Sequence, residues 1–225
     1  VRREFENTYP EYSTGSGYNH MMYKVATQLI GNFFKRLIEE NEFPLEVLGI
    51  EKEITADYQT FVHGDPVVVR LTGRIDRIDR VNGRLRVIDY KTGKVERKHL
   101  KVNGADQEEL MLHGNESGKI RQLWFYKYLV AKRMTQEKGL RLANQVLPSE
   151  QNTLVAGIYS FRNLKEGLLE DQLQMGEGTP ESFVKHSEEY LQKMLHQILD
   201  PAQSFTRTTN LKLCTNCGYK RICGR

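Results

Sequence analysis

Two aspartates and a lysine in the first half of this chain are spaced so that their side chains meet at one point. Residues 73–93 read as two β-strands joined at an Asn-Gly dipeptide (residues 82–83), which favours a tight hairpin turn. With that turn, Asp76 lies opposite Asp89, and opposed residues share a face with Cβ atoms about 5 Å apart. Lys91 follows Asp89 by two residues and shares that face. Two carboxylates and an ammonium in this arrangement predict a divalent-metal site that cuts phosphodiesters.

A structural role is the alternative for these acids, as exposed strand carboxylates paired with neighbouring arginines. That role suits Asp79, which the same register places opposite Arg86 on the other face of the hairpin. It suits Asp76 poorly, because its cross-strand neighbour Asp89 is another acid and like charges directly opposed destabilise a sheet. We therefore expect Asp79 to pair with Arg86, whereas Asp76 and Asp89 hold the metal and Lys91 serves the attacking water.

The elements expected around this hairpin form an α/β arrangement, a mixed β-sheet with a central antiparallel hairpin flanked by helices. Apolar periodicity predicts helices at residues 19–40, 119–132 and 181–199, and strands at 45–56, 67–80, 84–91 and 153–161. Residues 93–118 are expected to form a polar, Gly-rich connection. We expect a single domain over residues 1–225, with a helical lead-in at 1–44, a catalytic core at 45–161, and a C-terminal helix and Cys-rich tail at 181–225.

Composition restricts the class of protein further. Hydrophobic residues make up 39% and charged residues 28% of the 225 residues, which is typical of a globular protein and excludes a disordered chain. Neither a bilayer-spanning apolar run nor a charged-then-apolar leader is present, so we expect a cytoplasmic protein without a membrane partner. A net charge of +4 is compatible with a polyanionic partner but does not establish one. The opening at Val1 reads like mid-protein sequence, so we expect a C-terminal fragment of a longer protein.

The hairpin motifs resemble those of the PD-(D/E)XK nuclease superfamily, specifically the nuclease domain shared by RecB and AddB. The motifs that carry the resemblance are Gly73-Arg-Ile-Asp-Arg-Ile-Asp and Val87-Ile-Asp-Tyr-Lys-Thr-Gly. The resemblance implies a restriction-endonuclease-like core. It also implies that Asp76 and Asp89 bind Mg²⁺ or Mn²⁺ together with the main-chain carbonyl of Tyr90, and that Lys91 is catalytic.

A second motif lies on the predicted helix at 119–132. Gln122 and Tyr126 resemble the Gln-x-x-x-Tyr motif of the same family. Residues four apart share a helix face, so both side chains are expected to position a DNA strand. Taken alone, Tyr126 is better explained as an amphipathic core tyrosine, but Gln122 four residues earlier and the upstream Asp76, Asp89 and Lys91 reverse that preference. The implied function is Mg²⁺-dependent DNA hydrolysis by the exonuclease module of a RecB/AddB-type helicase–nuclease. Such a module acts on single-stranded ends in double-strand-break repair, beside a helicase region of the same or an associated chain.

Three cysteines near the C-terminus, Cys214, Cys217 and Cys223, have C-x₂-C-x₅-C spacing. Zinc and [4Fe–4S] sites normally take four ligands. Three alternatives follow: a fourth cysteine lies outside this fragment, a histidine completes a zinc site, or no metal binds. The spacing resembles the C-terminal iron–sulfur segment of AddB-type nucleases, where the fourth cysteine is N-terminal to the core and the cluster is structural.

Two other residues bear on the resemblance, and two other classes of function remain open. The family's metal-binding histidine lies on an early helix, but the residues flanking His20 do not match its context, so a helix-surface histidine is expected. Glu51 is expected to pair with a neighbouring base rather than to support the site. The other classes are a catalytically inactive DNA-binding module of the same fold and a Cys-metal interaction module with a purely structural hairpin.

Overall fold

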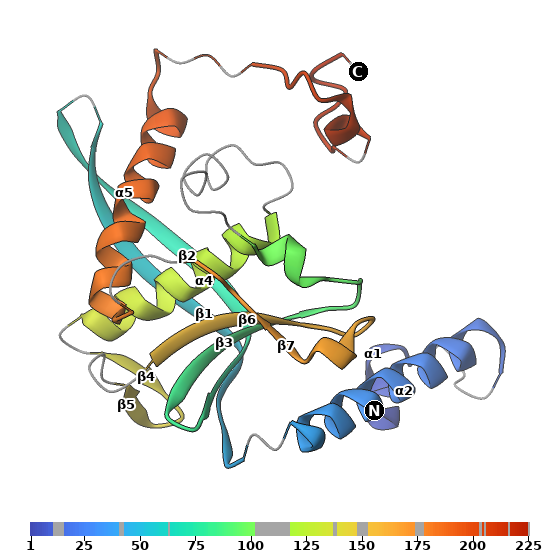
Figure 1. Cartoon of the computed structure of the whole chain (residues 1–225). Coiled ribbons are helices and arrows are strands. Elements are labelled where there is room, and N and C mark those ends of the chain that lie inside the picture. Colours follow the sequence, from blue (N-terminus) through green and yellow to red (C-terminus); the bar gives the residue numbers. More distant parts are fainter. Residues whose placement is uncertain are drawn as a thin grey trace.

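The computed structural model describes residues 1–10, 16–40, 43–62, 64–101, 118–136, 139–147, 153–173, 178–202, 204, 206–215 and 217–224. Its helices are α1 (Arg2–Thr8), α2 (Gly17–Glu39), α4 (Gly118–Thr135) and α5 (Pro180–Leu199), with 3₁₀ helices at Arg97–Leu100, Leu164–Glu166 and Leu211–Cys214. Its strands are β1 (Leu45–Val62), β2 (Asp65–Val81), β3 (Arg84–Lys91), β4 (Leu140–Leu142), β5 (Gln145–Leu147), β6 (Thr153–Ser160) and β7 (Leu168–Glu170) (Figure 1). Most of the predicted polar connection, residues 102–117, lies outside the described residues.

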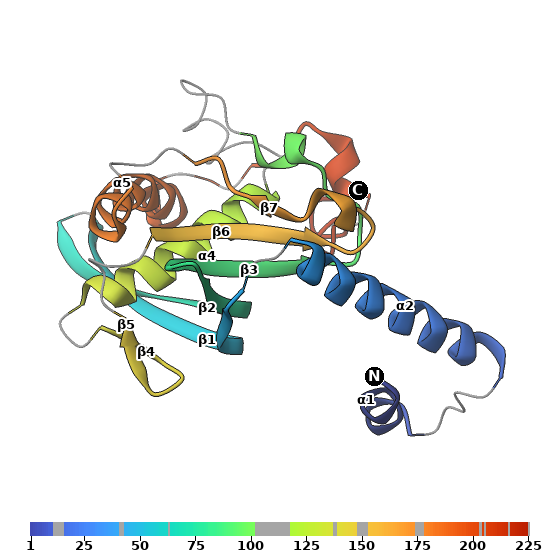
Figure 2. The ribbon, with the colours of Figure 1, turned by 60° about the horizontal axis from the view of Figure 1, so that its bottom comes forward.

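Five strands form one mixed sheet in the order β1-β2-β3-β6-β7. Strands β1, β2 and β3 pair antiparallel, β6 is parallel to β3, and β7 is antiparallel to β6. The chain crosses from β3 to β6 through α4, as a parallel pair requires. Helices α4 and α5 cover one face of the sheet, and the C-terminal half of α2 packs on the other (Figures 1 and 2). This arrangement confirms the expected α/β class. No helix in the described part of the chain is long and apolar enough to cross a membrane.

The hairpin register is the one predicted from the Asn-Gly turn. Asn82 and Gly83 have φ angles of 50° and 77°, the left-handed conformations that a type I′ turn requires. Ile78 pairs with Val87, and β3 has the predicted bounds Arg84–Lys91. Strand β1 is longer than predicted, because its pairing with β2 continues past the part of the sheet that the helices cover, up to Val62 opposite Asp65. The other elements that were not predicted are α1 and strands of three residues, too short for a periodic pattern.

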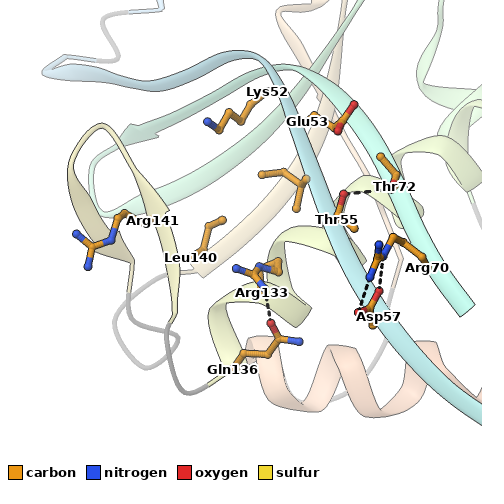
Figure 3. Close-up of a pocket in the computed structure, with 11 residues that line it drawn as sticks. Lys52, Glu53, Thr55, Asp57, Arg70, Thr72, Arg133, Gln136, Leu140 and Arg141 are labelled. Atoms are coloured by element: carbon orange, nitrogen blue, oxygen red, sulfur yellow. Dashed lines mark hydrogen bonds and ion pairs between the residues drawn. The ribbon is translucent and has the colours of Figure 1, made fainter. Parts of the chain in front are cut away.

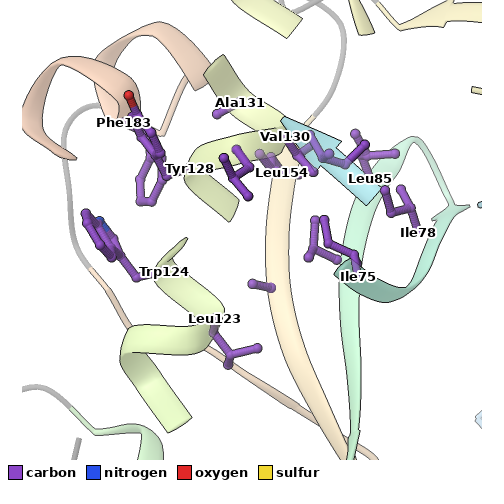
Figure 4. Packing of buried hydrophobic residues seen from close by; sticks show 14 of the residues in the cluster. Ile75, Ile78, Leu85, Leu123, Trp124, Tyr128, Val130, Ala131, Leu154 and Phe183 are labelled. Atoms are coloured by element: carbon purple, nitrogen blue, oxygen red, sulfur yellow. The ribbon is translucent and has the colours of Figure 1, made fainter. Parts of the chain in front are cut away.

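The core between the sheet and α4 depends on a close approach at Gly73. The core includes Ile75, Ile78, Leu85, Leu123, Trp124, Tyr128 and Phe183 (Figure 4). A Cβ at Gly73 would lie 2.8 Å from Leu129 Cδ1 and 3.1 Å from Tyr126 Cδ1, so a larger residue there would push α4 away from β2. The Trp124 indole N–H also donates to Ser187 Oγ at 3.0 Å, which joins α4 to α5.

The opposite face of the sheet carries a buried ionic cluster. Arg86 donates to the Asp79 carboxylate from Nε at 2.7 Å and from Nη2 at 3.1 Å, and Arg77 Nε lies 2.8 Å from Asp79 Oδ2. All three residues are at most 6% exposed. The Arg77 guanidinium lies 5.5–5.7 Å from the centres of three aromatic rings, those of Phe33, Tyr90 and Tyr159. The predicted pairing of Asp79 with Arg86 is confirmed, and the same cluster holds α2 against the sheet through Phe33.

We expect Asp79→Ala to lower the free energy of unfolding by about 3–5 kcal/mol, because it leaves two buried guanidinium groups without their counter-charge. Asp57→Ala is the matched control, since Asp57 pairs with Arg70 on the surface and exposed ion pairs contribute little. Urea denaturation of both variants measures the difference. Equal destabilisation by the two substitutions would contradict a buried ionic anchor.

Candidate active site

The candidate site forms where strands β2 and β3 part. Their pairing ends at Arg77 opposite Ile88, one residue short of the two acids. Beyond that point Asp76 Oδ2 accepts a hydrogen bond from the Tyr90 main-chain N–H at 2.8 Å. A side-chain oxygen thus replaces the main-chain acceptor that a continued ladder would provide. This bond holds the Asp76 carboxylate at the end of β3, close enough to Asp89 for its charge to act on that carboxyl group.

Side-chain alternation along β2 breaks at Asp76. Ile75 and Ile78 are three residues apart, so a regular strand would place them on opposite faces. Both instead belong to the core on the α4 side. The pairing of β1 with β2 also skips Asp76. The residue of β1 that it skips at the same place is Glu51, whose φ is 50°. The break places the Asp76 carboxylate at an irregular point of the sheet, beside the end of β3.

Asp89 is buried with its charge only partly compensated. It is 2% exposed, and Lys91 Nζ lies 2.8 Å from its Oδ2 atom. This Oδ2 atom is buried. Its contact with Lys91 is an ion pair whose angles do not meet those of a hydrogen bond, and no other described residue donates to it. Burial raises the pKa of Asp89, Lys91 opposes this effect and Asp76 adds to it, so the net pKa lies above its ordinary value.

Lys91 continues the site toward α4. Its Nζ donates to Gln122 Oε1 at 2.9 Å, and Gln122 Nε2 donates to Tyr126 Oη at 3.0 Å. Helix α4 presents both residues to the sheet, and the small Gly73 lets Tyr126 approach β2. The structure therefore brings the predicted Asp89, Lys91, Gln122 and Tyr126 into one continuous line of polar contacts.

Two residues weighed from the sequence lie apart from this line. Glu51 Oε2 lies 2.8 Å from Arg74 Nε in an exposed ion pair, which confirms the expected pairing with a neighbouring base. His20 is in the first turn of α2, thirteen residues before Phe33, whose ring packs on Tyr90. That separation corresponds to about 20 Å along the helix axis. The N-terminal half of α2 extends away from the sheet (Figure 2), as expected for a helix-surface histidine.

Sequence reasoning missed the anchors of the loop that follows Lys91. The Ser160 hydroxyl donates to the Gly93 carbonyl at 2.8 Å and accepts from the Val95 N–H at 2.9 Å. Asn163 Nδ2 donates to the Val95 carbonyl at 2.8 Å. Both side chains are buried at the end of β6, where Ser160 lies beside Lys91 in the parallel register. Their polarity at the end of an apolar strand is the signal that could have identified them.

The three cysteines are not brought together. Cys214, Cys217 and Cys223 lie beyond α5, Cys214 at the end of the 3₁₀ helix Leu211–Cys214, and all three are half-buried and outside any disulfide. Throughout the described ranges, no three His, Cys, Asp or Glu side chains form a group that could hold a metal ion. The thiols as placed do not fit a zinc or iron–sulfur site, so the cysteine spacing stays a prediction from sequence.

The carboxylate pair, in contrast, fits a hard cation. Mg²⁺ prefers oxygen ligands and usually takes one or two protein carboxylates, with waters and substrate phosphate in its remaining positions. Asp76 and Asp89 provide two such groups, and the buried Asp89 Oδ2 atom is engaged only by its ion pair with Lys91. The main-chain carbonyl of Tyr90 is the predicted third ligand. This donor set lacks sulfur and nitrogen, which favours Mg²⁺ or Mn²⁺ over zinc.

Comparison with known proteins identifies a family whose model matches almost the whole chain. The family model described as the PD-(D/E)XK nuclease superfamily matches residues 1–224. Among solved structures, the one titled "Crystal structure of SSO0001" matches with 17% sequence identity over 99% of this chain and 79% of that chain. Its TM-score is 0.27, which supports no inference about fold or function. None of the curated proteins matches.

We expect Asp89→Asn to stabilise the protein at neutral pH in a buffer that contains a metal chelator. A carboxyl whose pKa is raised by folding stabilises the folded state only while protonated, and this contribution is lost as the pH rises through the raised pKa. Asparagine carries no charge, so the variant should exceed the wild type in thermal stability at neutral pH. The gap should close as the pH falls toward the ordinary carboxyl pKa.

Asp57→Asn is the control of opposite sign for this measurement. The hydrogen bond from Arg70 lowers the pKa of Asp57, so that carboxylate stabilises the folded state above its ordinary pKa and stops doing so as the pH falls. Its replacement should leave neutral-pH stability unchanged or slightly lower. A loss of stability in Asp89→Asn at neutral pH would contradict an uncompensated buried charge at Asp89.

Proposed function

This chain belongs to the PD-(D/E)XK nuclease superfamily, and from that membership we propose that it is a metal-dependent nuclease that hydrolyses DNA phosphodiesters at Asp76, Asp89 and Lys91. The observation that carries the proposal is the line of contacts from Asp89 through Lys91 and Gln122 to Tyr126. A buried acid kept charged only by a lysine is unfavourable for stability. A site for a cation explains why such a residue is there.

Asp76 and Asp89 are the proposed metal ligands, together with the main-chain carbonyl of Tyr90. When bound, Mg²⁺ or Mn²⁺ supplies Lewis-acid stabilisation of the charge that develops on the phosphoryl oxygens. The hydrogen bond from the Tyr90 N–H fixes the orientation of the Asp76 carboxylate before any ligand arrives. Fixing a charged group in advance avoids a reorganisation penalty during the reaction.

Lys91 is proposed to act on the attacking water and the scissile phosphate. Its side chain is 31% exposed, and its ammonium is held between Asp89 and Gln122 at a defined position. A positive charge there offsets the negative charge that accumulates in the transition state, and its N–H groups can orient the water for attack.

Gln122 and Tyr126 are proposed to hold the DNA strand, and the direction of their hydrogen bonds supports this role. The Gln122 carbonyl oxygen accepts from Lys91, so its NH₂ group donates to the Tyr126 oxygen. The Tyr126 hydroxyl therefore has its own proton available to donate elsewhere. A phosphate oxygen of the substrate, an acceptor without a proton to give, suits that donor.

The wider setting follows from the resemblance of the motifs to RecB and AddB. We further propose an exonuclease module of a helicase–nuclease that processes single-stranded ends in double-strand-break repair in the cytoplasm, next to a helicase region of its own or an associated chain. The cysteine spacing belongs to the same resemblance, with Cys214, Cys217 and Cys223 as three ligands of a structural [4Fe–4S] cluster. Visible absorption of anaerobically purified protein tests for that cluster.

We expect Lys91→Ala to lower the rate of Mg²⁺-dependent DNA cleavage by more than about 100-fold, the usual loss when a proton-transfer or charge-stabilising group is removed. Asp89→Ala should have the same effect, and chelation of the metal should abolish cleavage by the wild type. Gel analysis of a labelled strand provides the measurement. Lys94→Ala is the matched control, because Lys94 is an exposed lysine three residues away that pairs with Glu96.

Unchanged rates in Lys91→Ala and Asp89→Ala would show that cleavage takes place elsewhere or comes from a contaminant. A wild type that binds DNA but never cleaves it with Mg²⁺ or Mn²⁺ would favour the inactive DNA-binding class instead. Folding of each variant is checked by its thermal transition, so that loss of structure is not mistaken for loss of chemistry.

The proposed exonuclease action has its own test. We expect a linear single strand to be degraded from its ends and a covalently closed circular single strand of the same sequence to resist, because an exonuclease needs a terminus. Gel electrophoresis of both substrates over time gives the answer. Conversion of the circle to linear product at the rate at which the linear strand is consumed would indicate endonuclease action.

A further inference from the structure

A polar hollow lies beside the edge strand β1, away from the candidate active site. It has a volume of about 690 Å³ and is formed by β1 and β2, the C-terminal end of α4 and the strand β4 (Figure 3). Its lining includes Lys52, Arg133, Gln136, Leu140 and Arg141. None of the predicted metal-binding, catalytic or strand-positioning residues borders it. The hollow is therefore a separate feature whose chemistry needs its own account.

The charged side chains that line this hollow are distributed unevenly over the two sides of β1. On one side Lys52, Arg133 and Arg141 lie around Leu140 with no acid among them (Figure 3). On the other side Asp57 accepts from Arg70 Nε at 2.9 Å, so those two charges neutralise each other. Glu53 adds a second carboxylate to that side, so the lining as a whole carries four cationic and two acidic side chains, with the positive excess on the side of Lys52, Arg133 and Arg141.

The cations on the first side are not engaged in ion pairs within the described residues. Arg133 Nη1 donates to the neutral Gln136 Oε1 at 2.7 Å. Neither Lys52 nor Arg141 forms a hydrogen bond or ion pair with another residue of the described ranges. Three such cations at one hollow favour an anionic ligand, because mutual repulsion between them is relieved only by negative charge. We call Lys52, Arg133 and Arg141 the basic side of β1.

The hollow continues into a neighbouring one, whose further charged residues Lys132 and Glu188 pair with each other, and this continuity favours a chain of phosphates over a single small anion. A second hollow of about 490 Å³ shares Asp57 and Gln136 with the first and extends it along β1 to Gln59. The basic side also connects to the candidate active site through α4. Gln122 and Arg133 are eleven residues apart on that helix, about 16 Å along its axis. Lys52 pairs with Ile75, the residue next to Asp76.

We infer that the basic side of β1 binds the phosphodiester backbone of the same DNA strand that the active site cleaves. This inference rests on the proposed function. At a rise of 3.4 Å per nucleotide, about five nucleotides span the distance of about 16 Å between Gln122 and Arg133 along α4. Contacts to phosphate position a strand without reading its sequence. The basic side of β1 thus extends the footprint of the nuclease beyond the cleaved bond and favours strands longer than about five nucleotides.

The test compares Lys52→Ala/Arg141→Ala with the matched double variant Lys165→Ala/Lys185→Ala, which removes two exposed lysines away from the hollow. Both pairs are placed in Asp89→Asn protein, so that binding is measured without cleavage. Fluorescence anisotropy gives the affinity for single strands of about 5 and about 15 nucleotides across a range of salt concentrations. Inorganic phosphate is included as a competitor.

Removal of two phosphate contacts should reduce the salt slope of log K for the longer strand by about 1.4, equivalent to roughly 10–30-fold weaker binding at 0.1 M salt. The control pair should bind the longer strand as the parent does. An equal loss in both double variants, a loss confined to the 5-nucleotide strand, or displacement by millimolar phosphate would overturn the inference. Failure of the wild type to cleave DNA, with the slope change still observed, would overturn the proposed function alone.

Discussion

Repulsion between the carboxylates of Asp76 and Asp89 is the constraint on which the arrangement of this site depends. The two strands that carry them separate at this level, since the pair nearest to the acids joins Arg77, which follows Asp76, to Ile88, which precedes Asp89. The Tyr90 N–H and the Lys91 ammonium partly compensate one acid each. The arginines nearest in sequence do not help, because Arg74 pairs with Glu51 and Arg77 with Asp79. The site therefore keeps a local excess of negative charge that a cation relieves.

The buried carboxylates on the two faces of the sheet are compensated to different extents. Toward α2, Asp79 is enclosed by two arginines, one of which is stacked among aromatic rings, so one buried carboxylate faces two buried cations. Toward α4, the Asp89 carboxylate is equally buried but keeps an oxygen without a hydrogen bond. A buried charge is tolerated when it is paired and is unfavourable when it is not. The first face is thus built for stability and the second for a ligand.

The sequence was sufficient to predict the parts of the site that follow from local rules. The Asn-Gly turn determines the register of β2 against β3, and that register separates the structural Asp79 from Asp76. The break in alternation at Asp76 was not predictable, because the period-2 rule assumes a regular strand. The close approach at Gly73 arises from a contact between segments distant in sequence, which no local pattern encodes. The polarity of Ser160 marks it as unusual at the end of an apolar strand, but the loop that it anchors follows only from the fold.

The line of hydrogen bonds through Gln122 has a direction, and that direction limits what the site can recognise. Both ends of the amide are committed, so the Tyr126 hydroxyl offers a donor and its lone pairs are partly occupied. Such a group distinguishes acceptors from donors but not one nucleobase from another, since every nucleotide presents the same phosphate oxygens. Binding through such contacts does not depend on base sequence. Lys91 determines the orientation of the Gln122 amide. That orientation would thus let the nuclease bind the backbone of a DNA strand of any sequence.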